Sequence, residues 1–250
     1  MTAAPPPPSR GERHAPPARA QALLAEARAT AGFLPVEEAM ALFAVAGRAL
    51  RAGTGPLVEI GSYLGRSTLF LAAAIAAADA SPAVVFSVDH HRGSEEMQRG
   101  WPDHDPALVD PRTGRMDSLG RFRATLERAD AEDLVVAVVG DSARVAANWS
   151  TPVVLVFIDG GHGAATCWAD YHGWARHVAP GGFLVFHDVF VDPAQGGRPP
   201  YECYADALAS ARFTEDAAAG CGSLRVLVRT PAPWDEEPTT LRRDGRTPPR

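Results

Sequence analysis

The feature that most constrains this chain's fold is a series of short, strongly apolar segments separated by helical stretches. Five segments rich in β-branched residues run without polar alternation, at 57–60, 84–88, 134–139, 153–158 and 183–186. Strands that are buried on both faces of a sheet have this continuous pattern. Helical stretches lie between or after them, at 67–78, 119–129, 164–178 and 201–211. The alternation predicts an α/β fold with a doubly wound, mostly parallel sheet and right-handed crossovers.

The two ends of the chain extend this outline. Two N-terminal helices are predicted, one over residues 19–30 and one that opens at Pro35. A last apolar run at 224–228 predicts an antiparallel edge strand that pairs near Phe213. Residues 1–17 and 231–250 are rich in Pro and Arg, which favours disordered tails over packed structure; a Pro-rich docking peptide is the alternative. One domain spanning 18–230 remains.

Composition excludes several classes of function. All 24 basic residues are Arg and the net charge is −6. Without Lys there is neither a Walker-type phosphate loop nor a Schiff base, and the acidic balance argues against nucleic acid as a partner. No apolar run approaches a membrane span, the N-terminus lacks a secretory h-region, and the three cysteines form no CxxC pair. We therefore expect a cytoplasmic protein that acts on a small molecule and has no membrane partner. A homo-oligomer is compatible with this expectation.

The informative residues follow the predicted strands, because open α/β sheets bind ligands at the carboxyl ends of their strands. After the first strand comes VEIGSYLGRST, with Gly61 and Gly65 in a tight turn and Ser67 opening a helix. The spacing E-x-G-x-x-x-G differs from the G-x-G-x-x-G of dinucleotide binders. Glu59 stands at an unusual place for a carboxylate; its plainer interpretation is an exposed strand-end residue.

Acidic residues also follow the second and third predicted strands. Asp89 ends SVD, where a carboxylate can accept both hydroxyls of a ribose; the alternative is a turn or helix-capping Asp. Asp141 and Ser142 follow in VVGDS, where they could bond an adenine edge, cap the next helix, or do both.

The fourth and fifth predicted strands end in neighbouring Asp and His residues. FIDGGH places Asp159 and His162 on a Gly-rich turn, and VFHD places His187 and Asp188 at the equivalent position. Four titratable groups at one rim indicate a functional site, since buried carboxylates need partners. A lone His, by contrast, is usually structural.

Two long loops are candidates for ligand recognition. Residues 90–115 carry Trp101 together with several carboxylates, a combination that suits a polar ring such as a sugar; a solvated insertion anchored by Trp101 is the alternative. The loop 191–200 follows Asp188 and could close over the site with Arg198.

The motifs EIGSYLGRST, SVDHH, VGDS, FIDGGH and PGGFLVFHD, in this order, resemble class I S-adenosylmethionine-dependent methyltransferases of Rossmann-like fold. The resemblance covers about 36–229. The most similar subgroup is the macrocin and cephalosporin-pathway type, which contains O-methyltransferases of secondary metabolism acting on sugars and natural products.

The resemblance implies roles for individual residues. The methionine part of the cofactor would lie against the turn that starts at Glu59, the ribose against Asp89, and the adenine beside Asp141 and Ser142. The residues implied to line the cofactor are Glu59, Gly61, Ser62, Gly65, Ser67, Asp89, Asp141, Ser142 and Asp159.

Methyl transfer to a hydroxyl of the acceptor molecule requires removal of the hydroxyl proton. A base or a metal ion is needed for this step. His162 is the candidate base, oriented by Asp159. Some relatives bind a divalent ion at the ends of strands four and five, where Asp159 and Asp188 stand; the ion expected here is Mg²⁺. His187 replaces a second acidic residue at that place, and it could also bind the acceptor together with Trp101 and Arg198.

Three other functions are compatible with parts of the pattern. An NAD(P)-dependent oxidoreductase would require the missing G-x-G-x-x-G. A non-catalytic nucleoside-binding protein would keep Gly61, Gly65 and Asp89 without needing His162 or Asp188. Methylation of a carboxylate or nitrogen would need less help from a base.

Overall fold

A computed structural model describes residues 16–80 and 82–234. Most of the two expected tails lies outside the described residues, namely 1–15 of the segment 1–17 and 235–250 of the segment 231–250. Within the described residues, no helix is both long and apolar enough to cross a membrane.

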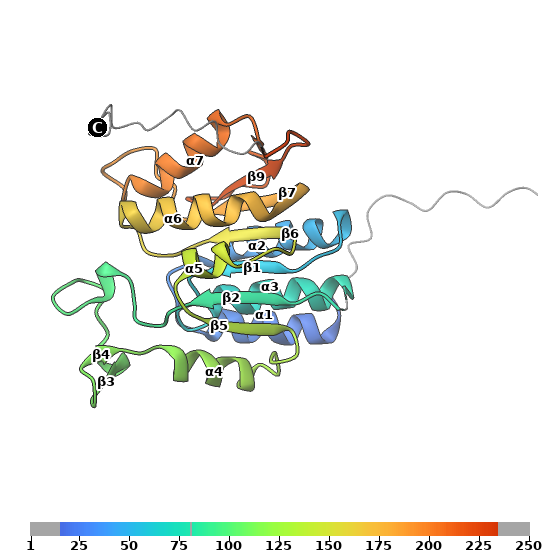
Figure 1. Cartoon of the computed structure of the whole chain (residues 1–250). Helices are drawn as coiled ribbons and strands as arrows, with labels where there is room; N and C mark the ends of the chain where they lie inside the picture. Colours follow the sequence, from blue (N-terminus) through green and yellow to red (C-terminus); the bar gives the residue numbers. More distant parts are fainter. Residues whose placement is uncertain (1–15, 81, 235–250) are drawn as a thin grey trace, which may run out of the picture.

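A seven-stranded sheet forms the centre of the molecule, in the order β5-β2-β1-β6-β7-β9-β8 (Figure 1). The first five of these pair in parallel, whereas β9 pairs antiparallel with β7 and β8. The strands are β1 (Leu57–Ile60), β2 (Val85–Asp89), β5 (Val135–Val139), β6 (Val153–Ile158), β7 (Val178–Phe186), β8 (Phe213–Glu215) and β9 (Arg225–Arg229). The predicted fold, including the antiparallel edge, is confirmed.

Helices cover both faces of the sheet (Figure 1). One core lies between the sheet and the helices α1 to α4, and a second lies between the sheet and α5 to α7. The helices are α1 (Ala18–Ala29), α2 (Val36–Ala52), α3 (Arg66–Ala78), α4 (Leu119–Arg128), α5 (Ser142–Ala147), α6 (Ala164–Trp174) and α7 (Pro199–Ala209). All six residues of β6 are buried, as its continuous apolar run predicts.

Three details differ from the sequence expectations. The Pro-Gly-Gly segment expected as a turn before the fifth strand lies inside β7, where the pairing register with β6 shifts. The helix predicted through Val178 ends at Trp174 and continues as a 3-10 turn. The folded chain also extends past residue 230, because Trp234 packs against Phe213 and the guanidinium group of Arg212.

The long loop after β2 has structure of its own. It contains two 3-10 turns (Glu95–Met97 and Pro106–Leu108) and a short hairpin of β3 (Val109–Asp110) and β4 (Arg115–Met116). Its first 3-10 turn lies at the carboxyl edge of the sheet and lines the pocket described below.

Candidate active site

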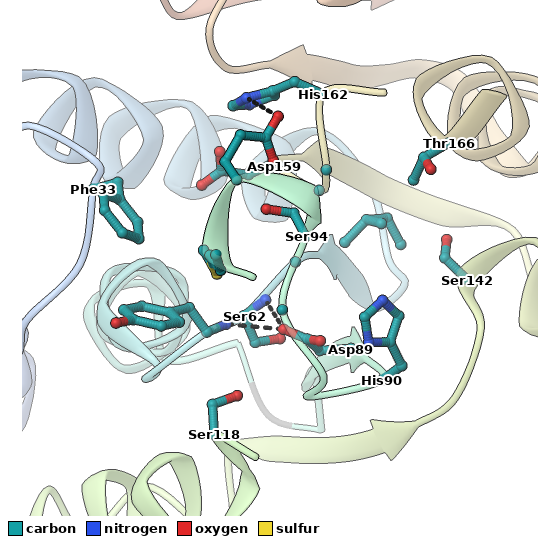
Figure 2. Close-up of a pocket in the computed structure, with 18 of the residues that line it drawn as sticks. Phe33, Ser62, Asp89, His90, Ser94, Ser118, Ser142, Asp159, His162 and Thr166 are labelled. Atoms are coloured by element: carbon teal, nitrogen blue, oxygen red, sulfur yellow. Dashed lines mark hydrogen bonds and ion pairs between the residues drawn. The ribbon is translucent and has the colours of Figure 1, made fainter. Parts of the chain in front are cut away.

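A pocket of about 540 Å³ opens at the carboxyl ends of β1, β2, β5 and β6. The chain winds outward in opposite directions from β1 and β6, so this edge is the point where the strand order reverses. Seven of the residues expected to contact a cofactor line it: Gly61, Ser62, Ser67, Asp89, Asp141, Ser142 and Asp159. Figure 2 shows Asp89, His90 and Ser142 on one side of the pocket, with Asp159 and His162 across from them.

Gly61 allows the ends of β1 and β6 to approach closely. Its φ is +86°, and a Cβ atom at this position would lie 2.1 Å from the backbone oxygen of Asp159. A side chain would therefore displace the neighbouring strand end, so glycine is required by both conformation and space.

Asp89 lines the pocket and also orders the turn after β1. Its carboxylate accepts hydrogen bonds from the backbone N–H groups of Ser62 (2.9 Å), Tyr63 (3.0 Å) and His91 (2.6 Å), two of which are drawn in Figure 2. Oδ1 receives only one of the three, from His91. A carboxylate has about four acceptor positions, so capacity remains for a ligand hydroxyl.

Glu59 does not line the pocket, contrary to the expectation from sequence. Its side chain is fully buried beneath the turn, where it accepts hydrogen bonds from Thr68 Oγ1 (2.5 Å) and Ser87 Oγ (2.7 Å). Burial raises the pKa of this carboxyl to about 7, although hydroxyl donors partly offset the effect. Ser87 in turn is hydrogen-bonded to the hydroxyl of Ser62, so Glu59 supports the pocket from below.

Gly65 is also absent from the lining. It lies at the capping position just before α3 with a φ of +92°, and a Cβ atom here would lie 3.2 Å from the ring of Phe122, so glycine suits this turn. At the opposite end of the pocket, the structure shows the capping role expected for Asp141, while the adenine contact of Asp141 and Ser142 stays a prediction. Asp141 caps α5 by accepting from Arg144 N–H (2.9 Å), Ser142 Oγ accepts from Trp174 Nε1 (2.8 Å), and both still line the pocket.

The Asp and His residues after β6 and β7 form one connected cluster. His162 Nε2 lies 2.9 Å from Asp188 Oδ2, and His187 Nδ1 lies 2.8 Å from Asp159 Oδ1 and 3.1 Å from Asp188 Oδ2. Glu38 of α2 reaches the same cluster, with Oε2 at 3.0 Å from His187 Nε2. The carboxylate paired with His162 is thus Asp188 and not Asp159, because Asp159 turns toward His187.

This arrangement shifts the titration of each member. Hydrogen bonding to Asp188 raises the pKa of His162 despite the opposing effect of burial. Burial opposes the ionised form of Asp188, but donation from His162 and His187 outweighs it and keeps the pKa of this carboxyl low. Burial also opposes the charge on His187, yet Asp159, Asp188 and Glu38 together raise its pKa far above the ordinary value.

The same groups do not fit a magnesium ion. Ligand atoms of Asp159, His187 and Asp188 all lie within 4.8 Å of one another. However, the side of His187 that faces the carboxylates is its Nδ1, which is within hydrogen-bond distance of both. Mg²⁺ requires near-octahedral oxygen ligands and several waters, and here an imidazole ring takes the bridging position.

The residues expected to bind the acceptor lie outside the pocket lining. Trp101 is 48% exposed, and His187 is buried behind the rim. Arg198 donates to the backbone oxygens of Phe190 and Val191 and stacks on Tyr201, so it fixes the loop after β7 instead of reaching inward. The sequence expectations for these three residues rested on residue type and position in the chain, and neither shows which atoms a side chain contacts in the folded protein.

Other residues supply the wall that sequence analysis missed. Phe33, from the connection between α1 and α2, lies against Tyr63 with ring centroids 5.2 Å apart, and both line the pocket with Met97. Phe33 remains 54% exposed, so its ring is open to a ligand in the pocket. The sequence around Phe33, just before Leu34-Pro35, contains no motif that would identify it as a pocket residue.

Comparison with known proteins agrees with this architecture. The profile of a family described as a methyltransferase domain matches residues 58–189, more than half of the chain. The chain belongs to this methyltransferase family.

Solved structures of similar fold include three methyltransferases. The O-methyltransferase NovP shares 15% identity at a TM-score of 0.60, with 78% of this chain and 80% of NovP covered. TomG, an O-methyltransferase of Streptomyces achromogenes involved in tomaymycin synthesis and solved with S-adenosylmethionine, shares 15% identity at 0.55, covering 86% and 90%. The calicheamicin methyltransferase CalS11 shares 15% identity at 0.54, covering 91% and 99%.

Proposed function

We propose that this protein is an S-adenosylmethionine-dependent O-methyltransferase that acts on a hydroxyl group of a sugar, glycoside or other small natural product. The observation that carries the proposal is the position of His162, held by Asp188 at the rim of a pocket whose other side is the Asp89 and Gly61 turn. A nucleoside site and a candidate base thus share one cavity of a size suited to a small ligand.

The pocket residues fit the cofactor. Asp89 would hold the ribose hydroxyls through its free acceptor capacity, and Asp141, Ser142 and His90 would lie around the adenine. Asp159 lines the opposite side, where its carboxylate would hold an amino group. When bound, S-adenosylmethionine supplies a methyl group on a positively charged sulfur, open to in-line attack by an oxygen nucleophile.

His162 would remove the proton of the acceptor hydroxyl. Because Nε2 donates to Asp188, the lone pair of the neutral ring resides on Nδ1, and this tautomer is the one assigned from the contacts. Nδ1 also lies 3.7 Å from Glu96 Oε1, so the ring that gains the proton is stabilised by carboxylates on both sides. Nδ1 would take the proton of the acceptor hydroxyl, whose oxygen would then receive the methyl group that the cofactor supplies.

The wall formed by Phe33, Tyr63 and Met97 would receive the rest of the acceptor. Aromatic faces stack on flat or ring-bearing ligands, so the wall favours a glycoside or aromatic natural product. This matches the macrocin-like subgroup that the motifs resemble. The three cysteines form no disulfide, which supports a reducing, cytoplasmic setting for this domain.

The test is transfer of a labelled methyl group from S-adenosylmethionine to a panel of glycosides and aromatic natural products, followed by mass spectrometry of the products. His162→Ala should lower kcat by about 10²- to 10⁴-fold while cofactor binding persists. His172→Ala, an exposed histidine on α6, is the matched control and should turn over normally. Wild-type turnover by His162→Ala would exclude the proposed base.

A further inference from the structure

The pocket is lined by a large excess of negatively charged side chains. Eight of its lining residues are Asp or Glu, whereas one arginine and two histidines line it. The chain contains no Lys that could add a positive charge. S-adenosylmethionine carries an ammonium group, a sulfonium group and a carboxylate, so its single net positive charge would compensate only a small part of this excess. The remaining charge favours a second ligand that is positively charged.

Three of these carboxylates come from the loop after β2, and the proposed cofactor contacts use none of them. Glu95 and Glu96 lie on the 3-10 turn Glu95–Met97. Asp103 lies beside this turn because its N–H donates to the backbone oxygen of Glu96 (3.3 Å). Within the described residues, no arginine forms an ion pair with any of the three. We call Glu95, Glu96 and Asp103 the acidic rim.

Glu96 extends from the acidic rim to the candidate base. Its Oε1 lies 3.7 Å from Nδ1 of His162. Its Oε2 is buried and meets no hydrogen-bond donor in the part of the chain that the structure describes. A buried carboxylate oxygen without a donor is costly, and a positive charge beside it offsets that cost. This oxygen is an observation separate from the excess of charge, and it indicates a cation bound next to the base.

The wall of Phe33, Tyr63 and Met97 suits the same kind of ligand. The rings of Phe33 and Tyr63 line the pocket with centroids 5.2 Å apart. Met97 belongs to the same 3-10 turn as Glu95 and Glu96, so the wall and the acidic rim are adjacent. Ammonium groups are attracted to the faces of aromatic rings, and this attraction adds to that of a carboxylate. Aromatic and acidic side chains thus meet on one side of the pocket.

We propose that the acceptor is a cation, namely a ring-bearing molecule with a protonated amine. The amine lies between the acidic rim and the rings of the wall, while a hydroxyl of the same molecule faces Nδ1 of His162. Amino sugars and other amine-bearing natural products meet this description, whereas phosphorylated or carboxylated acceptors are repelled by the rim. The inference rests on the proposed function, because it names the acceptor class of that reaction.

The first test compares three ligands that share a phenol ring and differ in the charge of the side chain: tyramine (positive), tyrosol (neutral) and 4-hydroxyphenylacetate (negative). Their affinities for the protein saturated with S-adenosylhomocysteine are measured by calorimetry at neutral pH. Tyramine should bind about 10-fold more tightly than tyrosol, as expected for one contact with a charged group, and 4-hydroxyphenylacetate more weakly than either. Added NaCl should weaken the binding of tyramine but not that of tyrosol. Tyramine that binds no better than tyrosol would overturn the proposal.

The second test removes charge from the acidic rim. Glu96→Gln keeps the shape of the side chain, and it should lower the affinity for tyramine by about 10-fold while the affinity for tyrosol is retained. The double variant Glu95→Gln/Asp103→Asn changes two exposed positions and should also reduce the preference for tyramine, which keeps the test decisive if Glu96→Gln does not fold. Glu132→Gln, exposed and outside the pocket lining, is the matched control. A full preference for tyramine in both rim variants would contradict the proposed contact.

Neither test requires methyl transfer, so the two proposals can fail separately. If folded protein does not bind S-adenosylhomocysteine, the proposed function is wrong. If S-adenosylhomocysteine binds and the three phenols bind without regard to charge, the cationic acceptor is wrong and the proposed function remains.

Discussion

Replacing Glu59 with glutamine should stabilise the protein at alkaline pH. The fully buried carboxyl has a pKa of about 7 against an ordinary value of 4.5, so the folded state retains its proton over an interval in which the unfolded chain loses it. The contribution of Glu59 to stability is complete below about 4.5 and is lost as the pH rises toward 7. At about 1.36 kcal/mol per pKa unit, the full loss is about 3 kcal/mol.

Glutamine cannot ionise, and its amide oxygen can accept from Thr68 and Ser87 as the carboxylate does. Glu59→Gln should therefore gain about 2 to 3 kcal/mol relative to wild type between pH 5 and pH 8. For a chain of this size the gain corresponds to about 5–10 °C in melting temperature.

The assay is thermal unfolding of both proteins at several pH values, with Glu132→Gln as an exposed control that should show no such trend. A difference between Glu59→Gln and wild type that does not grow with pH would refute the burial argument. Loss of stability at every pH would show instead that the ionised carboxylate is an essential hydrogen-bond acceptor.

Three further predictions concern the pocket and its surroundings. Asp89→Ala should weaken S-adenosylmethionine binding by about 10- to 150-fold in calorimetry, the equivalent of about 1.5–3 kcal/mol for hydrogen bonds to a charged group; unchanged affinity would remove Asp89 from the cofactor site. Because the pKa of His162 is raised and its neutral form is the base, kcat/KM should increase as the pH rises through a value above 6.5, and Asp188→Asn should move this limb to lower pH while reducing the rate. A limb that stays in place in Asp188→Asn would contradict the assignment of the base. Trp234→Ala should cost about 1–2 kcal/mol of unfolding free energy, since the indole packs on Phe213 and beneath two guanidinium groups; no change would mean that these contacts are not made in solution.

The sequence predicted the site where motif and strand end coincide. Asp89, Asp159 and His162 could be placed at one edge because the carboxyl ends of parallel strands converge there. Glu59 was misassigned because a strand residue two positions before the turn points into the sheet interior, and its depth depends on α3 and β2 packing over it. No local sequence pattern indicates how deeply such a side chain is buried.

Side-chain pairing was less predictable than position. The proximity of Asp159 to His162 in the chain suggested that they pair, yet Asp188 from the neighbouring strand is the actual partner. Phe33 and Glu38 reach the site from the N-terminal helices, which pack against the sheet only in the folded state. Contributions of this kind depend on tertiary packing, and a single sequence carries no spacing rule for them.

The most direct test of the account is equilibrium binding of the nucleoside cofactor. Calorimetry with S-adenosylmethionine and with S-adenosylhomocysteine should each show saturable binding at one site per chain, and NAD⁺ at the same concentrations should show none. Binding of NAD⁺ in preference to S-adenosylmethionine, or no binding of S-adenosylmethionine by folded protein, would contradict the proposed function.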